Sequence, residues 1–169
     1  SWAEENLDDV RKFLINEPRG HADMYGGFVV PADDENGDLG VVFFHKDGFS
    51  TACGHGTIAL VTWAIDSGLI EPKDEVVTVI VDVPSGRLVT EAKVHDQKVE
   101  SVCFQNVPSF VSATNISLQT SVGQVSADIS FGGAFYASVN AGELELSPTA
   151  SNIDALISLG KEIKDQLKD

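Results

Sequence analysis

The stretch Phe49-Ser-Thr-Ala-Cys-Gly-His-Gly-Thr-Ile-Ala-Leu60 joins a strand-like run to a helix-like run. Cys53 stands where the helix is expected to begin, and Gly54 and Gly56 flank His55. Small residues at a helix start leave its first backbone N–H groups open to an anion. The same helix end stabilises a thiolate, because the helix dipole is positive there. The stretch therefore predicts a reactive thiol beside a binding site for a carboxylate.

The run that follows, residues 57–70, carries apolar side chains on nearly every side. A helix of this kind is typically buried, so we expect a central helix that a sheet encloses and that ends at Gly68. Asn6 and Asn152 are each expected to cap a further helix. Alternating apolar residues between turn signals predict strands at residues 24–30, 39–44, 76–83, 87–94, 99–107, 125–130 and 134–139.

The motif Cys53-Gly-His-Gly-Thr-Ile-Ala59 resembles the first active-site motif of the proline racemase family, which includes hydroxyproline epimerases and trans-3-hydroxyproline dehydratases. The resemblance implies an α+β fold like that of diaminopimelate epimerase. In that fold an antiparallel curved sheet wraps around a buried central helix, and two such domains related by a pseudo-twofold axis hold the active site between them. Four more stretches agree with the family in type and order: Glu17-Pro-Arg-Gly-His-Ala-Asp-Met24, Asp82-Val-Pro-Ser-Gly86, Asn106-Val-Pro-Ser-Phe110 and Phe131-Gly-Gly-Ala-Phe-Tyr-Ala137.

The family's second catalytic motif, of the type Asp-x-x-Pro-Cys-Gly-Thr-Gly-Thr, does not occur in the sequence. The other cysteine, Cys103, lies in Val-Cys-Phe-Gln, with no glycine-rich loop after it. We therefore expect an internal piece, roughly half of a family member, that is inactive alone. Residues 1–122 are expected to form the first catalytic domain without its opening strand. Residues 123–169 are expected to form the opening strand and helix of the second domain.

The resemblance assigns roles to the residues around the motif. Cys53 becomes the catalytic acid/base, and the backbone N–H groups of Gly54, His55 and Gly56 become the site for the substrate carboxylate. Tyr25 is expected to form a wall of the pocket, and the flanking Ser50 to shape it.

Each of these assignments has an alternative. A free cysteine such as Cys53 is often a small buried hydrophobic residue, and Tyr25 equally fits ordinary core packing. His21 and Asp23 either line the pocket or fix the end of a strand. A metal site of His21, Cys53 and His55 matches no familiar metal-binding spacing, so we predict no metal.

The implied chemistry is proton transfer at Cα of proline or hydroxyproline without a cofactor. Such an enzyme must hold the carboxylate among hydrogen-bond donors and place a strong base against Cα. A thiolate and a thiol on opposite faces of the ring give racemisation or epimerisation. A single cysteine on the Cα side permits dehydration of trans-3-hydroxy-L-proline, which stays open as an alternative. A hydrolase with Cys53 as its nucleophile is an alternative of another class.

The net charge of −15 disfavours nucleic acid and anionic membranes as partners. The longest apolar runs are too short to span a bilayer. Two cysteines in different settings do not indicate a disulfide framework, so we expect a cytoplasmic protein. The expected partners are the small-molecule substrate and either the remainder of the second domain or a second copy of the chain.

Overall fold

The computed structural model describes residues 1–21 and 23–167, which form two compact units, Ser1–Val107 and Pro108–Asp169. The sequence placed the boundary between residues 122 and 123. The structure divides the chain earlier, because the strand at residues 110–120 pairs with the strand at residues 123–131 rather than with the first sheet.

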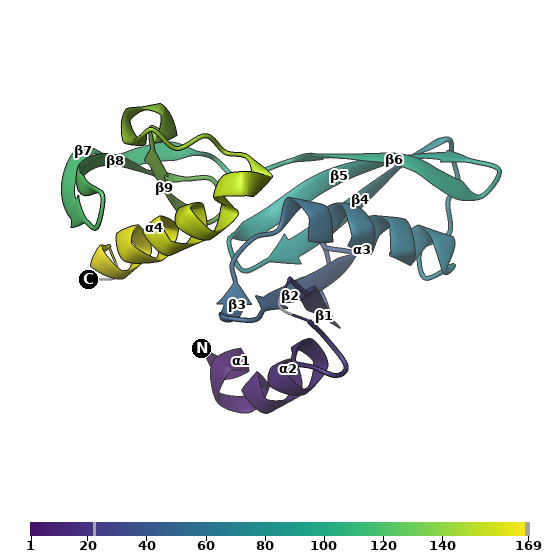
Figure 1. The fold of residues 1–169 in the computed structure, drawn as a ribbon. Coiled ribbons are helices and arrows are strands. Elements are labelled where there is room, and N and C mark those ends of the chain that lie inside the picture. The colour runs from purple at the N-terminus through teal and green to yellow at the C-terminus, as the bar shows by residue number, and fades with distance from the viewer. Residues whose placement is uncertain (22, 168–169) are drawn as a thin grey trace. The chain divides into compact units, whose positions relative to one another are not determined.

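The first unit carries a six-stranded sheet in the order β1-β2-β4-β5-β6, with β3 pairing beside β2 (Figure 1). All neighbouring strands are antiparallel except β2 and β4, which run parallel because β3 and α3 form a crossover between them. The elements are α1 (Trp2–Asn6), α2 (Asp8–Ile15), β1 (Tyr25–Val30), β2 (Leu39–His45), β3 (Gly48–Ser50), α3 (Gly54–Asp66), β4 (Val76–Val83), β5 (Gly86–His95) and β6 (Lys98–Gln105).

The central helix α3 packs against β1, β5 and β6. It buries Leu60, Val61, Ala64 and Ile65 in the core that it forms with the sheet. This confirms the expected α+β class, with a curled sheet around an apolar helix. The opposite side of α3 stays open in the described chain, where Trp63 is 49% exposed.

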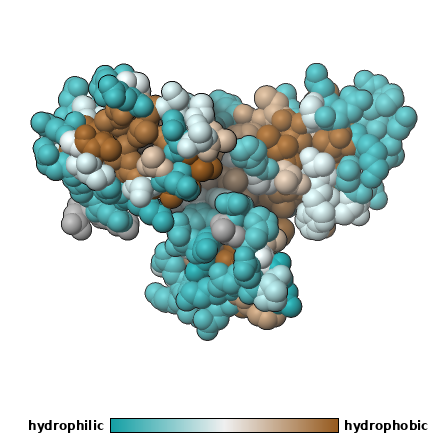
Figure 2. Space-filling view, in the orientation of Figure 1, coloured by the Kyte–Doolittle hydropathy of each residue, from teal (hydrophilic) through white to brown (hydrophobic). Residues whose placement is uncertain are grey.

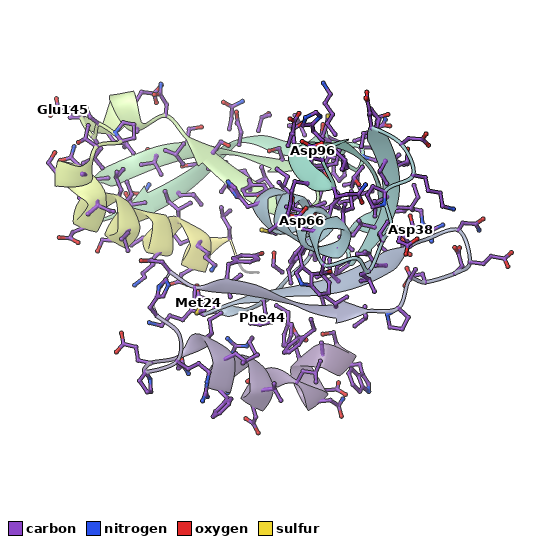
Figure 3. The ribbon with its side chains drawn as sticks, turned by 90° about the vertical axis from the view of Figure 1, so that its right-hand side faces the viewer. Met24, Asp38, Phe44, Asp66, Asp96 and Glu145 are labelled. Carbon is purple, nitrogen blue, oxygen red and sulfur yellow. The ribbon has the colours of Figure 1, made fainter. Side chains whose placement is uncertain are left out.

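The other face of the sheet lies against the N-terminal helices. Phe44 points to the side of the strands on which α1 and α2 lie (Figure 3), and it is nearly fully buried. Its ring centroid lies 4.6 Å from that of Phe28. Buried Arg11 of α2 donates to the carbonyls of His45 and Lys46, at 2.7 and 2.8 Å, and so ties α2 to the turn after β2.

The prediction of a single helix that begins after Asn6 is wrong. Ser1 caps α1 through a capping box, Asn6 is the last residue of that helix, and α2 begins after Leu7. The helical conformation is interrupted at Leu7, whose φ of −118° and ψ of 0° lie outside the helical range. Asn152 does precede the last helix as expected, although its side chain makes no capping hydrogen bond there.

The second unit is a three-stranded antiparallel sheet in the order β7-β8-β9, with α4 beside it (Figure 1). Its small core is formed by Leu118, Val125, Ala127, Leu159 and Ile163. Its elements are β7 (Phe110–Thr120), β8 (Gly123–Phe131), β9 (Phe135–Val139), two 3-10 turns η1 (Ala141–Leu144) and η2 (Ala150–Asn152), and α4 (Ile153–Gln166). None of the helices found within residues 1–21 and 23–167 has the length and apolar character needed to cross a membrane.

Candidate active site

Cys53 occupies the N-cap position of α3, in extended backbone conformation. Its Sγ accepts a hydrogen bond from the N–H of Gly56 at 3.3 Å. Its carbonyl accepts hydrogen bonds from both the N–H and the hydroxyl of Thr57, each at 2.9 Å. The sulfur therefore takes the place that a Ser or Asp oxygen holds at an ordinary N-cap. These contacts fix the half-buried thiol at the positive end of the helix dipole.

Two hydrogen bonds hold the irregular segment that leads to Cys53. The hydroxyl of Ser50 donates to the carbonyl of Ala52 at 3.0 Å. The N–H of Ser85, from the turn between β4 and β5, donates to the carbonyl of Thr51 at 3.1 Å. The hydroxyl of Ser50 thus bonds to the backbone of its own loop.

An apolar cavity of about 650 Å³ opens beside the thiol, between β1 and α3. It brings together four of the predicted site residues, Tyr25, Cys53, His55 and Gly56. Gly54 and Ser50 are not among its lining residues. The remaining lining residues are Gly26, Gly27, Val29, Val41, Phe43, Ala59, Leu60 and Trp63. Figure 2 shows apolar residues at the surface over α3 and the strands next to it.

The first turn of α3 has little free space on one side. A Cβ atom on Gly56 would lie 2.4 Å from Cε1 of the buried Phe43 ring. A Cβ atom on Gly54 would lie 3.3 Å from Cζ of Phe104. Since the N–H of Gly56 already faces Sγ, the first-turn donors that remain for an anion are those of Gly54 and His55.

Several residues that complete the cavity were not predicted from the sequence. Gly27 and Phe43 are register partners in β1 and β2, and both line it. The Gly26-Gly27 pair was the available signal, because two glycines inside a strand often mark a close approach of another group. The apolar pattern predicts Trp63 on a buried helix, yet Trp63 lines the cavity and is half exposed.

Cys103, His21 and Asp23 lie away from the cavity. Cys103 is exposed on β6, opposite Glu91. His21 accepts a hydrogen bond at Nδ1 from the N–H of Asp23 at 3.2 Å, and neither residue lines the cavity. Within residues 1–21 and 23–167, no group of three or more His, Cys, Asp and Glu side chains is placed to hold a metal ion.

Charged groups anchor the turn that reaches the cysteine loop. Arg87 donates to both carboxylate oxygens of the buried Asp82, at 2.7 and 2.9 Å, and to Asp34 at 2.8 Å. These hydrogen bonds from Arg87 are the main cause that lowers the pKa of Asp82 and of Asp34 below the ordinary aspartate value. The same carboxylates raise the pKa of Arg87, so all three groups stay charged at neutral pH.

The family model for proline racemase matches residues 1–169 in full. The chain belongs to the proline racemase family. It is 42% identical, over 95% of its length, to a trans-3-hydroxy-L-proline dehydratase from Colwellia psychrerythraea, of which it covers 45%. It is 39% identical, over 97% of its length, to a 3-hydroxyproline 2-epimerase from Burkholderia multivorans, of which it covers 49%.

A solved member of this family has the same fold. A hydroxyproline epimerase from Agrobacterium vitis with bound trans-4-hydroxy-L-proline superimposes with a TM-score of 0.90 at 28% identity. The superposition covers 95% of this chain and 47% of that one. This proline racemase family chain thus spans about half the length of the relatives that it matches.

Proposed function

We propose that the protein carrying this chain is a cofactor-independent racemase or epimerase of proline or hydroxyproline. In this proposal Cys53 is one of the two groups that exchange a proton with Cα. The observation that carries it is the Sγ of Cys53, which lies at the N-terminus of α3 and at the wall of an apolar cavity. The match of the proline racemase family model to residues 1–169 supports the same reaction class.

The proposed mechanism follows from the charges involved. The Cα proton of an amino acid is very weakly acidic, so its removal needs a strong base in a site with little water. The apolar lining around Cys53 supplies one wall of such a site. In this proposal the N–H groups of Gly54 and His55 bind the substrate carboxylate, where negative charge increases in the transition state. A thiol from the rest of the protein would return the proton on the opposite face of the ring.

The second candidate is dehydration of trans-3-hydroxy-L-proline, which the name of the Colwellia relative favours. Dehydration also begins with removal of the Cα proton, so Cys53 would serve both reactions. The two differ at the group on the opposite face, which the resemblance places in the second motif.

The test is exchange of the Cα hydrogen in deuterated water, followed by NMR, with the full-length protein and three substrates. The substrates are L-proline, trans-4-hydroxy-L-proline and trans-3-hydroxy-L-proline. We expect exchange with at least one of them, and a loss of roughly 10²- to 10⁴-fold in a Cys53→Ser variant. A new epimer supports the first candidate, and a cyclic imine product supports the second. Unchanged exchange in Cys53→Ser, or peptide or ester hydrolysis without exchange, would refute both.

The proposed compartment is the cytoplasm. Cys53 and Cys103 are both free, and a reducing compartment keeps an acid/base cysteine in its thiol form. Fractionation with an antibody against the chain tests this.

A further inference from the structure

The motif Asp82-Val-Pro-Ser-Gly86 has no part in the chemistry proposed above, yet it contacts the loop that carries the thiol. Residues 51–53 have no regular structure between β3 and α3. The carbonyl of Ala52 is held from within the loop, by Ser50. The carbonyl of Thr51 is held from another element, by the N–H of Ser85 at 3.1 Å.

The turn that carries Ser85 is itself firmly fixed. Val83 and Gly86 pair across it, and Gly86 adopts a φ of +140°, a conformation that favours glycine. Next to the turn, Arg87 binds the carboxylate of Asp82, which also accepts the N–H of Asp33 at 2.8 Å. A fixed turn that holds Thr51 also restricts Cys53, two residues further on.

The side chain of Ser85 makes no hydrogen bond that would stabilise the turn. Its Oγ is the one buried side-chain polar atom without a hydrogen-bond partner in the part of the chain that the structure describes. A buried hydroxyl without a partner destabilises a fold. The contact that Ser85 makes to the site is therefore that of its backbone amide.

We propose that Ser85 is a positioning residue for Cys53. Its amide holds the carbonyl of Thr51, and this contact keeps Sγ within reach of the N–H of Gly56. The importance of this contact for catalysis rests on the proposed function, but its effect on Cys53 can be measured without any substrate.

The experiment compares the labelling rates of Cys53 and Cys103 by iodoacetamide in the 169-residue chain, with peptide mass spectrometry at several pH values. The exposed Cys103 is the internal control. Ser85→Pro removes the amide donor, and Ser85→Ala keeps the amide and removes only the hydroxyl. We expect Ser85→Pro to slow Cys53 labelling at neutral pH by roughly three- to tenfold. The reason is that the hydrogen bond from the N–H of Gly56 to Sγ favours the thiolate, which is the form that reacts with iodoacetamide. We expect no change at Cys103 in either variant, and no change at Cys53 in Ser85→Ala.

A second variant keeps the test decisive if Ser85→Pro does not fold. Arg87→Gln removes the ion pair that fixes the same turn. It should slow the labelling of Cys53 but not of Cys103, by a smaller factor than Ser85→Pro. Arg87→Lys, which keeps the positive charge, should lower the labelling rate of Cys53 less than Arg87→Gln does. An unchanged or faster rate at Cys53 in a folded Ser85→Pro or Arg87→Gln chain would overturn the proposal. Equal changes at both cysteines would overturn it too, because they indicate general loosening. Failure of the proposed function would instead appear as absent Cα exchange in the full-length protein, whatever the labelling result.

Discussion

Cys53 has two roles at the scale of a single residue, because the atom proposed to move a proton also caps a helix. Its Sγ accepts the N–H of Gly56, one of the four donors that a helix start leaves without an internal acceptor. The central helix α3 therefore begins at the proposed catalytic residue. A substitution at Cys53 can change the stability of the fold and the proposed chemistry independently.

Cys53→Ser and Cys53→Ala should separate these effects. Serine is among the preferred N-cap residues, so Cys53→Ser should keep the free energy of unfolding of the chain, whereas Cys53→Ala should lose about 0.5–2 kcal/mol. Both variants should lower the rate of Cα exchange in the full-length protein by roughly 10²- to 10⁴-fold. Urea unfolding followed by circular dichroism checks the stability, and equal stability of the two variants would contradict a capping role for the sulfur.

Gly56 should be the least tolerant glycine of the motif. Gly56→Ala places a methyl group 2.4 Å from the Phe43 ring, which is 2% exposed and has little room to move. We expect a loss of about 1–3 kcal/mol in the free energy of unfolding, as for other overpacked cores. Gly54→Ala is the matched control, because its methyl group would lie 3.3 Å from Phe104 and should cost less. Similar unfolding midpoints for the two variants would contradict the prediction, because they would show that the Phe43 ring moves to accommodate the methyl group.

At the scale of elements, an ion cluster joins the loop after β1 to the hairpin of β4 and β5. Arg87 connects Asp82 and Asp34, and Asp82 also accepts the N–H of Asp33. Because the Asp82 carboxylate is buried and bonded in its charged form, protonation should weaken this junction.

The stability of the chain should therefore depend on pH through Asp82. Its pKa is lower in the folded chain than in the unfolded one, chiefly because of Arg87. The stabilisation is thus present above the unfolded pKa of about 3.9 and is lost as the pH falls through the lower folded pKa. Urea midpoints measured from pH 7 down to pH 3 should fall less steeply below pH ~4 in Asp82→Asn than in the unaltered chain. Asp9→Asn, at an exposed site on α2, is the control. A parallel fall in all three chains would contradict this origin of acid sensitivity.

At the scale of the whole molecule, both units leave apolar side chains uncovered. In the first unit Val29 and Trp63 are about half exposed beside the cavity. In the second, Phe110 and Phe135 are 53% and 64% exposed, and the ring of Phe110 stacks on that of Phe131 with centroids 5.3 Å apart. Exposed apolar patches of this kind are typical of surfaces that bind another polypeptide or a ligand, or that promote aggregation.

The 169-residue chain alone should therefore associate and should not turn over proline derivatives. An active site that excludes water needs a second wall, and the resemblance places that wall and its catalytic group in the rest of the protein. Light scattering should detect particles larger than 18.0 kDa. Polarimetry and Cα exchange with L-proline and trans-4-hydroxy-L-proline should detect no reaction. Robust turnover by a monomeric chain would show that one cysteine and one wall suffice.

The sequence by itself determined most of the elements and placed Cys53 at the start of the central helix, although it did not predict β3 or β7. The Cys53-Gly-His-Gly56 run fixed where α3 begins, and strand alternation placed most of the sheet, because caps and periodicity are local properties of the chain. The same local run carried the family resemblance, which the match over residues 1–169 confirmed.

Only the tertiary structure decided how these elements meet. The parallel pairing of β2 with β4, the bond from Ser85 to Thr51 and the unit boundary at Val107 all depend on residues far apart in the chain. The apolar pattern of residues 57–70 predicted burial on every side, but burial requires a neighbour, and Trp63 is still 49% exposed. A sequence pattern indicates which side chains are apolar and tend to be buried, whereas packing between distant segments of the chain determines which residues bury them.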